Sequence, residues 1–243
     1  MNLISRLQEF DGKSLGEDDD GESCFGKLLP GLNRTELEEL QGLIPCPISA
    51  PMMDILSLTR GIEPAFDSID FSGLSLTHSF EMKELLPHGL PIAGDGFGNF
   101  WVADLTAQSK DWGPIFYVCH DPPVLVCQAR TFEEFLIQVM SFASFEENSL
   151  INHVHDICSA QIWKDNPGVV KTEDLMHPGD PDLGLFVQSL KKGYQFVDLR
   201  RAKIGDGISW GRFGAKTELI RNGSQRLFAY RKEPNFIQKL LGY

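Results

Sequence analysis

The sequence has no long hydrophobic run and no paired-cysteine motif. A membrane-spanning helix needs about 20 mostly apolar residues, whereas apolar runs such as residues 115–119 and 122–127 are far shorter. Residues 1–16 carry charged side chains and lack an apolar core, unlike a signal peptide. The five cysteines are irregularly spaced and form no C-x-x-C pair. These absences predict a cytoplasmic protein with reduced thiols, no disulfide framework and no membrane partner.

Basic residues are scarce in most of the chain. Its 243 residues are 42% hydrophobic and 23% charged, as in folded globular proteins of one or two domains. The net charge of −12 is uneven, because residues 1–189 carry −20 and residues 190–243 carry +8. The acidic part should repel nucleic acid and attract basic proteins, and the basic part should do the opposite.

Helix caps and alternating apolar residues predict an α+β fold. Residues 12–31 contain glycines and an acidic run and resemble a tether, and an acidic, flexible N-terminal segment is predicted over residues 1–29. Asn33 or Thr35 can cap a first helix, and Thr131 can cap a later one. Further helices are expected over residues 50–59 and 147–163. Four β-rich runs between tight turns favour an antiparallel meander, and they lie at residues 90–93, 99–105, 114–119 and 124–129.

A second β-rich unit is predicted near the C-terminus. Residues 177–184 have a loop-like composition, and Asn222-Gly223 favours a hairpin. A closing helix is expected over residues 236–241. The β-rich runs lie at residues 195–199, 208–212, 218–220 and 226–230. The sequence thus predicts an α+β domain over residues 30–164 and a basic β-rich unit over residues 165–243.

The central motifs are similar to those of a known family. They are Ile44-Pro45 with the helix ending at Gly61, then LPIAGDGFGNFWVADL over residues 90–105 and GPIFYVCHDPPVLVCQARTFEEFL over residues 113–136. This order resembles the SUKH superfamily, which joins fungal cell-wall-synthesis regulators to bacterial toxin-immunity proteins. The resemblance covers roughly residues 30–145. It implies helices packed on a mostly antiparallel sheet, with no catalytic residues and no cofactor, in a module that often occludes a toxin.

Acidic and polar residues surround the connections of the predicted meander. The candidates for partner binding are Asp95, Asn99, Asp104, Asp111, His120 and Asp121, with Glu133 and Glu134 nearby. An acidic surface speeds encounter with a cationic partner, and a toxin that cuts nucleic acid needs a basic cleft. The resulting hypothesis is an immunity-type protein that binds and occludes a basic, nuclease-like toxin. The alternative that these charges serve solubility alone stays open.

Other motifs favour simpler interpretations. The run Gly94–Gly98 opens a strand, whereas a phosphate-binding loop opens a helix, so a turn without a cofactor is expected. His153, His155 and Cys158 lack the second ligand cluster of a zinc site, so no metal is expected. Two alternatives stay open: an intracellular scaffold or regulator of cell-wall or growth processes, and an enzyme with its site at the domain junction near His120, His153 and His155.

The basic C-terminal unit admits two interpretations. Aromatic residues are interleaved with its lysines and arginines, namely Trp210, Phe213, Phe228 and Tyr230. Such a surface can bind single-stranded nucleic acid through phosphate attraction and base stacking, which makes it the chain's one candidate for that partner. The favoured interpretation is that it docks on the acidic domain of its own chain, or of a second copy in a homodimer.

Overall fold

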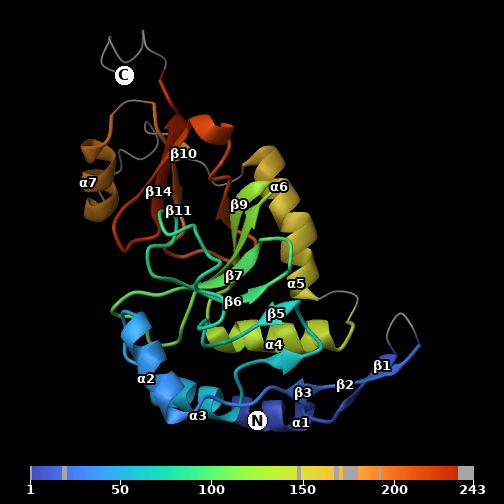
Figure 1. Cartoon of the computed structure of the whole chain (residues 1–243). Helices are drawn as coiled ribbons and strands as arrows, with labels where there is room; N and C mark the ends of the chain where they lie inside the picture. The colour runs from blue at the N-terminus through green and yellow to red at the C-terminus, as the bar shows by residue number, and fades with distance from the viewer. Residues whose placement is uncertain are drawn as a thin grey trace.

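The computed structural model describes residues 2–17, 21–146, 149–166, 170–171, 180–191 and 193–234. These residues confirm the predicted α+β fold, which is built around a six-stranded antiparallel sheet (Figure 1). The strand order is β12-β9-β8-β7-β6-β5. The strands are β5 (Ser68–Ile69), β6 (Gly89–Gly94), β7 (Phe100–Asp104), β8 (Ile115–His120), β9 (Pro123–Ala129) and β12 (Gly207–Ile208). The four runs of the predicted meander are β6 to β9, paired in sequence order.

Helices cover one face of the central sheet. Trp101, Tyr117 and Val126 alternate with residues of the opposite face and share a core with Leu56 of α3 (Ala50–Leu58) and Phe135 of α4 (Phe132–Ala143). Figure 1 shows α1 to α3 at the N-terminal end of the molecule and α5 with α6 along one side. The helices are α1 (Leu3–Phe10), α2 (Arg34–Leu43), α3 (Ala50–Leu58), α4 (Phe132–Ala143), α5 (Leu150–Asn152), a π-helical segment (His153–Cys158) and α6 (Ser159–Asp165).

A second sheet covers the other face. Its order is β10-β11-β14-β13, and its strands are β10 (Val170–Lys171), β11 (Gln195–Asp198), β13 (Thr217–Arg221) and β14 (Leu227–Lys232). Phe116 and Leu125 of the central sheet pack in one cluster with Val197 and Phe228 of the second. Every residue of β7 is therefore buried. Strand β12 lies beyond the predicted boundary near residue 165 but pairs with β9 of the central sheet, and described residues on the two sides of that boundary share a hydrophobic cluster.

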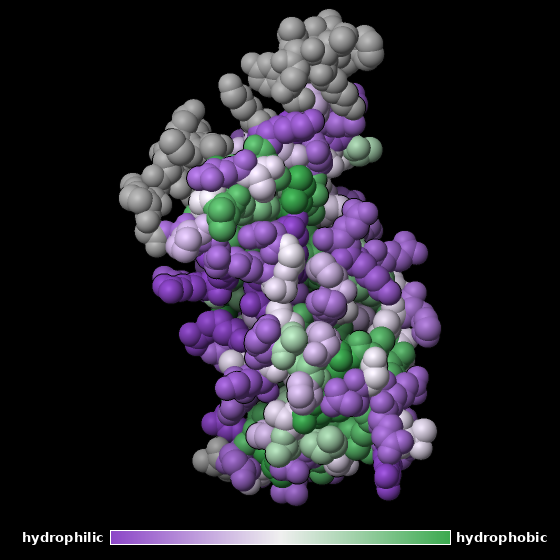
Figure 2. All heavy atoms as spheres, turned by 90° about the vertical axis from the view of Figure 1, so that its left-hand side faces the viewer, coloured by the Kyte–Doolittle hydropathy of each residue, from purple (hydrophilic) through white to green (hydrophobic). Residues whose placement is uncertain are grey.

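Helix α7 (Pro181–Ser189) packs on the outer side of the second sheet, where the rings of Phe186 and Phe196 meet with centroids 5.9 Å apart. The loop predicted over residues 177–184 is therefore wrong from Pro181 onward. The side chain of Asp180 accepts a hydrogen bond from the Leu183 amide at 3.1 Å and caps this helix. On the face that carries α2 and α7, hydrophobic side chains form separate patches among hydrophilic ones (Figure 2).

The tether predicted near the N-terminus is corrected by the structure. Helix α1 buries Leu7 and Phe10, and Leu15 of β1 (Ser14–Glu17) joins the same core. Strand β1 pairs with β2 (Ser23–Phe25), and β3 (Lys27–Leu28) pairs with β4 (Ile62–Glu63). Short strands rich in glycine and acidic residues show little alternation of apolar and polar residues, so the composition alone predicted an unfolded segment. The predicted Asn222-Gly223 hairpin is confirmed as the β13–β14 turn, and the predicted helix at residues 236–241 lies outside the described residues.

A buried carboxylate links the two sheets. Asp104, at the end of β7, is fully buried. Its two carboxylate oxygens accept hydrogen bonds from Arg221 at 3.0 and 2.8 Å, and one also accepts from Arg226 at 2.7 Å. The structure thus confirms that the basic unit docks on the acidic domain of its own chain.

We expect Asp104→Ala to lower the free energy of unfolding by about 3–5 kcal/mol, because it leaves the buried Arg221 guanidinium without its partner. Urea titration followed by circular dichroism measures this change. The exposed Asp165 offers a matched control, and Asp165→Ala should change stability by at most about 0.5 kcal/mol. Equal effects of the two substitutions would contradict the role of Asp104 in joining the sheets.

Acid should weaken the second sheet through Glu218. A hydrogen bond from Tyr194, helped by Arg231 at 2.7 Å, lowers the pKa of Glu218 in the folded protein. The ionised Glu218 therefore stabilises the folded protein fully at pH values above its pKa in the unfolded chain. This stabilisation is lost as the pH falls through its pKa in the folded protein. We expect the free energy of unfolding to fall between about pH 5 and about pH 3, and Glu218→Gln to reduce that fall. Glu39→Gln, which removes the same charge at an exposed position of α2, is the matched control.

Candidate partner-binding surface

Two neighbouring turns form one end of the central sheet. Phe100 of β7 pairs with Val118 of β8, so the turn before β7 lies beside the turn after β8. This register brings together four of the predicted partner-binding residues, namely Asp95, Asn99, His120 and Asp121. We call these four residues, with Asp67 and Phe97, the turn surface.

Asn99 connects the two turns. Its side chain is nearly buried, and its Oδ1 accepts a hydrogen bond from the backbone amide of His120 at 3.0 Å. The same oxygen lies 2.8 Å from His120 Nδ1, which must carry the proton because an amide oxygen only accepts. Asn99 Nδ2 donates to Asp95 Oδ2 at 2.6 Å. Asp95 Oδ1 in turn accepts from the amides of Phe97 and Asn99 at 2.9 and 3.2 Å, so the loop is held in one conformation.

Phe97 projects from this fixed loop. It is 80% exposed, more than any other large hydrophobic residue in the described part of the chain. Gly96 and Gly98 on either side have φ angles of 76° and 89°, which glycine adopts without strain. A Cβ at Gly96 would lie 2.0 Å from Asp67 Oδ2, so Asp67 approaches the loop closely. Sequence reasoning treated the loop as a turn and missed Phe97, although an aromatic residue between two glycines is an unusual choice for a solvated turn.

Two predicted partner-binding residues lie elsewhere. Asp104 is buried between two arginines, so its assignment to a docking face is wrong. Arg221 and Arg226 lie more than a hundred positions further along the chain, and local sequence does not show that they cover Asp104. Asp111 is exposed at the opposite end of the strands, where it lines a cavity of about 580 Å³ with Asp54 and Glu133. Its role in partner binding stays a prediction.

The three histidines do not form one group. His155 lies near the turn surface, with its Nε2 3.9 Å from Asp95 Oδ2 and its Nδ1 2.6 Å from Asp156 Oδ1. His120 faces Asn99, and His153 is exposed on the π-helical segment. Within the described ranges, no group of three or more histidine, cysteine or acidic side chains has a metal-binding arrangement, and no helix is long and apolar enough to cross a membrane.

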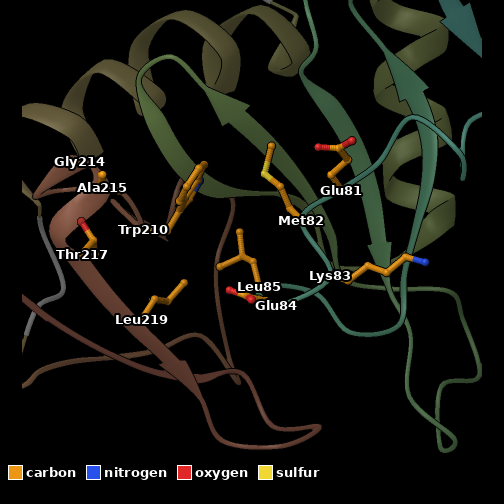
Figure 3. Close-up of a pocket in the computed structure, with 11 residues that line it drawn as sticks. Glu81, Met82, Lys83, Glu84, Leu85, Trp210, Gly214, Ala215, Thr217 and Leu219 are labelled. Atoms are coloured by element: carbon orange, nitrogen blue, oxygen red, sulfur yellow. The ribbon is translucent and has the colours of Figure 1, made fainter. Parts of the chain in front are cut away.

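A hollow of about 350 Å³ opens between residues 81–85, residues 210–215 and strand β13. Figure 3 shows Trp210 and Leu219 on one side of it, with Met82 and Leu85 opposite. Its charged residues include both Glu84 and Lys83, and none of the three histidines lines it. This hollow therefore does not hold the histidines on which the predicted enzyme site would depend.

The SMI1 / KNR4 family (SUKH-1) matches residues 3–138. The chain belongs to this family. The match spans the N-terminal helices, strands β1 to β9 and most of α4, so it includes every residue of the turn surface. It confirms the resemblance and begins at residue 3, well before the predicted start near residue 30. Membership supports a toxin-immunity or SMI1/KNR4-type role in general, in a family of generally non-catalytic proteins. No curated protein and no solved structure matches the chain.

We expect Asn99→Ala to destabilise the protein by about 1–3 kcal/mol, because it removes the buried acceptor of two hydrogen bonds and the donor to Asp95. Hydrogen exchange should also become faster at the amides of Phe97 and His120. Phe97→Ala, in the same loop but at an exposed side chain, should change stability by at most about 0.5 kcal/mol. Unchanged exchange in the Asn99 variant would show that these hydrogen bonds do not hold the loop.

Proposed function

We propose that this protein is a non-catalytic, immunity-type binding module that docks a basic, nuclease-like toxin on the turn surface and occludes it. The observation that carries the proposal is the exposure of Phe97 on a loop fixed by hydrogen bonds and flanked by carboxylates. A partner that buries Phe97 gains apolar contact. Because the loop is already ordered, its binding costs little conformational entropy. Such pre-organised aromatic side chains are typical centres of protein interfaces.

Charge supports a basic partner. Several arginines of the C-terminal unit are used within the chain: Arg221 and Arg226 bind Asp104, Arg200 binds Asp180 and Asp198, and Arg231 binds Glu218. These pairs involve only two acidic residues of the range 1–189, Asp104 and Asp180, whereas that range carries a net charge of −20. An acidic exterior accelerates encounter with a cationic protein and disfavours nucleic acid.

The thiols support a cytoplasmic location. All five cysteines are free, and four of them are buried. Burial raises the pKa of Cys127 to about 12, so this thiol stays protonated and unreactive. Unpaired cysteines at these positions are compatible with a reducing compartment.

Affinity capture from the native host tests the proposal. Wild-type protein is the bait, beside Phe97→Ala, Asp121→Lys and the control Asp165→Lys, which makes the same charge change on α6. We expect a basic protein to be retained by the wild type and the control, with at least about tenfold weaker binding for Phe97→Ala. Its affinity should fall as the salt concentration rises, because exposed charges are screened.

Co-expression then separates the two roles of the family. If the captured protein stops growth when expressed alone and this chain relieves the arrest, the immunity role is supported. If the captured protein is harmless, the chain acts as a regulator or scaffold, and the toxin part of the proposal is wrong. Retention that is equal for all four baits would place the interface elsewhere on the molecule.

A further inference from the structure

A small cavity opens beside the turn surface. It measures about 210 Å³ and lies between the loop that carries Asp95, the segment around Phe66, and the helices α4 and α5. The residues that line it are Ala65, Phe66, Asp67, Asp95, Trp101, Phe142, Ile151, Asn152 and His155. No lysine or arginine is among them. The cavity therefore combines apolar walls with acidic side chains on its rim.

Hydrogen-bond acceptors converge on this cavity. Asp67 is exposed, and the side chain of Asp95 keeps 14% of its surface accessible. His155 also lines the cavity, with Nδ1 2.6 Å from Asp156 Oδ1 and Nε2 3.9 Å from Asp95 Oδ2. Two carboxylates, with no lysine or arginine among the lining residues, favour a ligand that is rich in hydrogen-bond donors.

The apolar wall is aromatic. The rings of Phe66 and Trp101 meet with centroids 4.2 Å apart, and Phe142 stacks on Phe66 at 5.5 Å. Phe66 is only partly buried and lines the cavity, so part of its ring is accessible to a ligand there. A flat cation packs favourably on such a ring, because the face of the π-system is negative.

We infer that this cavity receives an arginine side chain of the docked protein. A guanidinium has five N–H donors in one plane, which suits acceptors on the rim and an aromatic wall, whereas an ammonium group has three donors and does not stack. The inference rests on the proposed function, since it names the side chain by which a basic partner is recognised next to Phe97. It also explains why the acidic residues Asp67 and Asp95 are placed at an apolar hollow.

NMR titration of the full chain tests the inference without the partner. The probe is N-acetyl-arginine methylamide, and the neutral isostere N-acetyl-citrulline methylamide is its control. We expect saturable shifts of the Trp101 indole and of the amides of Phe97 and His155 with the arginine probe. Citrulline should bind at least about tenfold more weakly, because it keeps the shape and loses the charge.

A pair of matched variants locates the binding. Asp67→Asn with Asp95→Asn keeps the size of both side chains and should weaken the arginine probe about tenfold. Asp54→Asn with Asp111→Asn removes the same charge at the other acid-lined cavity and should have no effect. Equal binding of arginine and citrulline, or equal loss in both double variants, would overturn the inference. The capture experiment is independent, so a partner that depends on Phe97 while the probe fails leaves the proposed function standing.

Discussion

The burial of Asp104 between two arginines is the interaction on which the rest of the structure depends. A carboxylate removed from water is costly unless charged donors surround it, and here Arg221 and Arg226 supply them from the second sheet. The apolar contacts between the sheets are not directional, whereas these hydrogen bonds specify one position of the β13–β14 hairpin against β7. The C-terminal unit is therefore held on the part of the chain that the family match covers.

This arrangement limits where a partner can dock. With helices on one face and the second sheet on the other, strands β6 to β9 are buried over almost their whole length, and their more exposed residues lie at the strand ends. The turn surface lies at one such end. Because arginines of the basic unit point inward or pair with nearby carboxylates, they do not neutralise the acidic residues at these turns.

The turn surface owes its shape to hydrogen bonds more than to packing. Asn99 is nearly buried and bonds to both turns, so the conformation of the Phe97 loop is coupled to the position of His120. A loop held in this way loses little conformational entropy when a partner binds. The cavity at Asp95 extends the turn surface toward helices α4 and α5. The exposed side chain of Phe97 and the acid-lined cavity are therefore next to each other on one surface.

Local features of the sequence determined much of the central fold. Asn33 and Thr131 cap their helices as predicted, and the four β-rich runs became β6 to β9, since caps and period-two alternation act between near neighbours. Only the tertiary structure decided which residues surround each acidic side chain. Strand register placed the turn of Asp95 beside the turn of His120, while Asp104 was covered by arginines far along the chain. Such long-range pairing depends on how sheets stack, which no local pattern records.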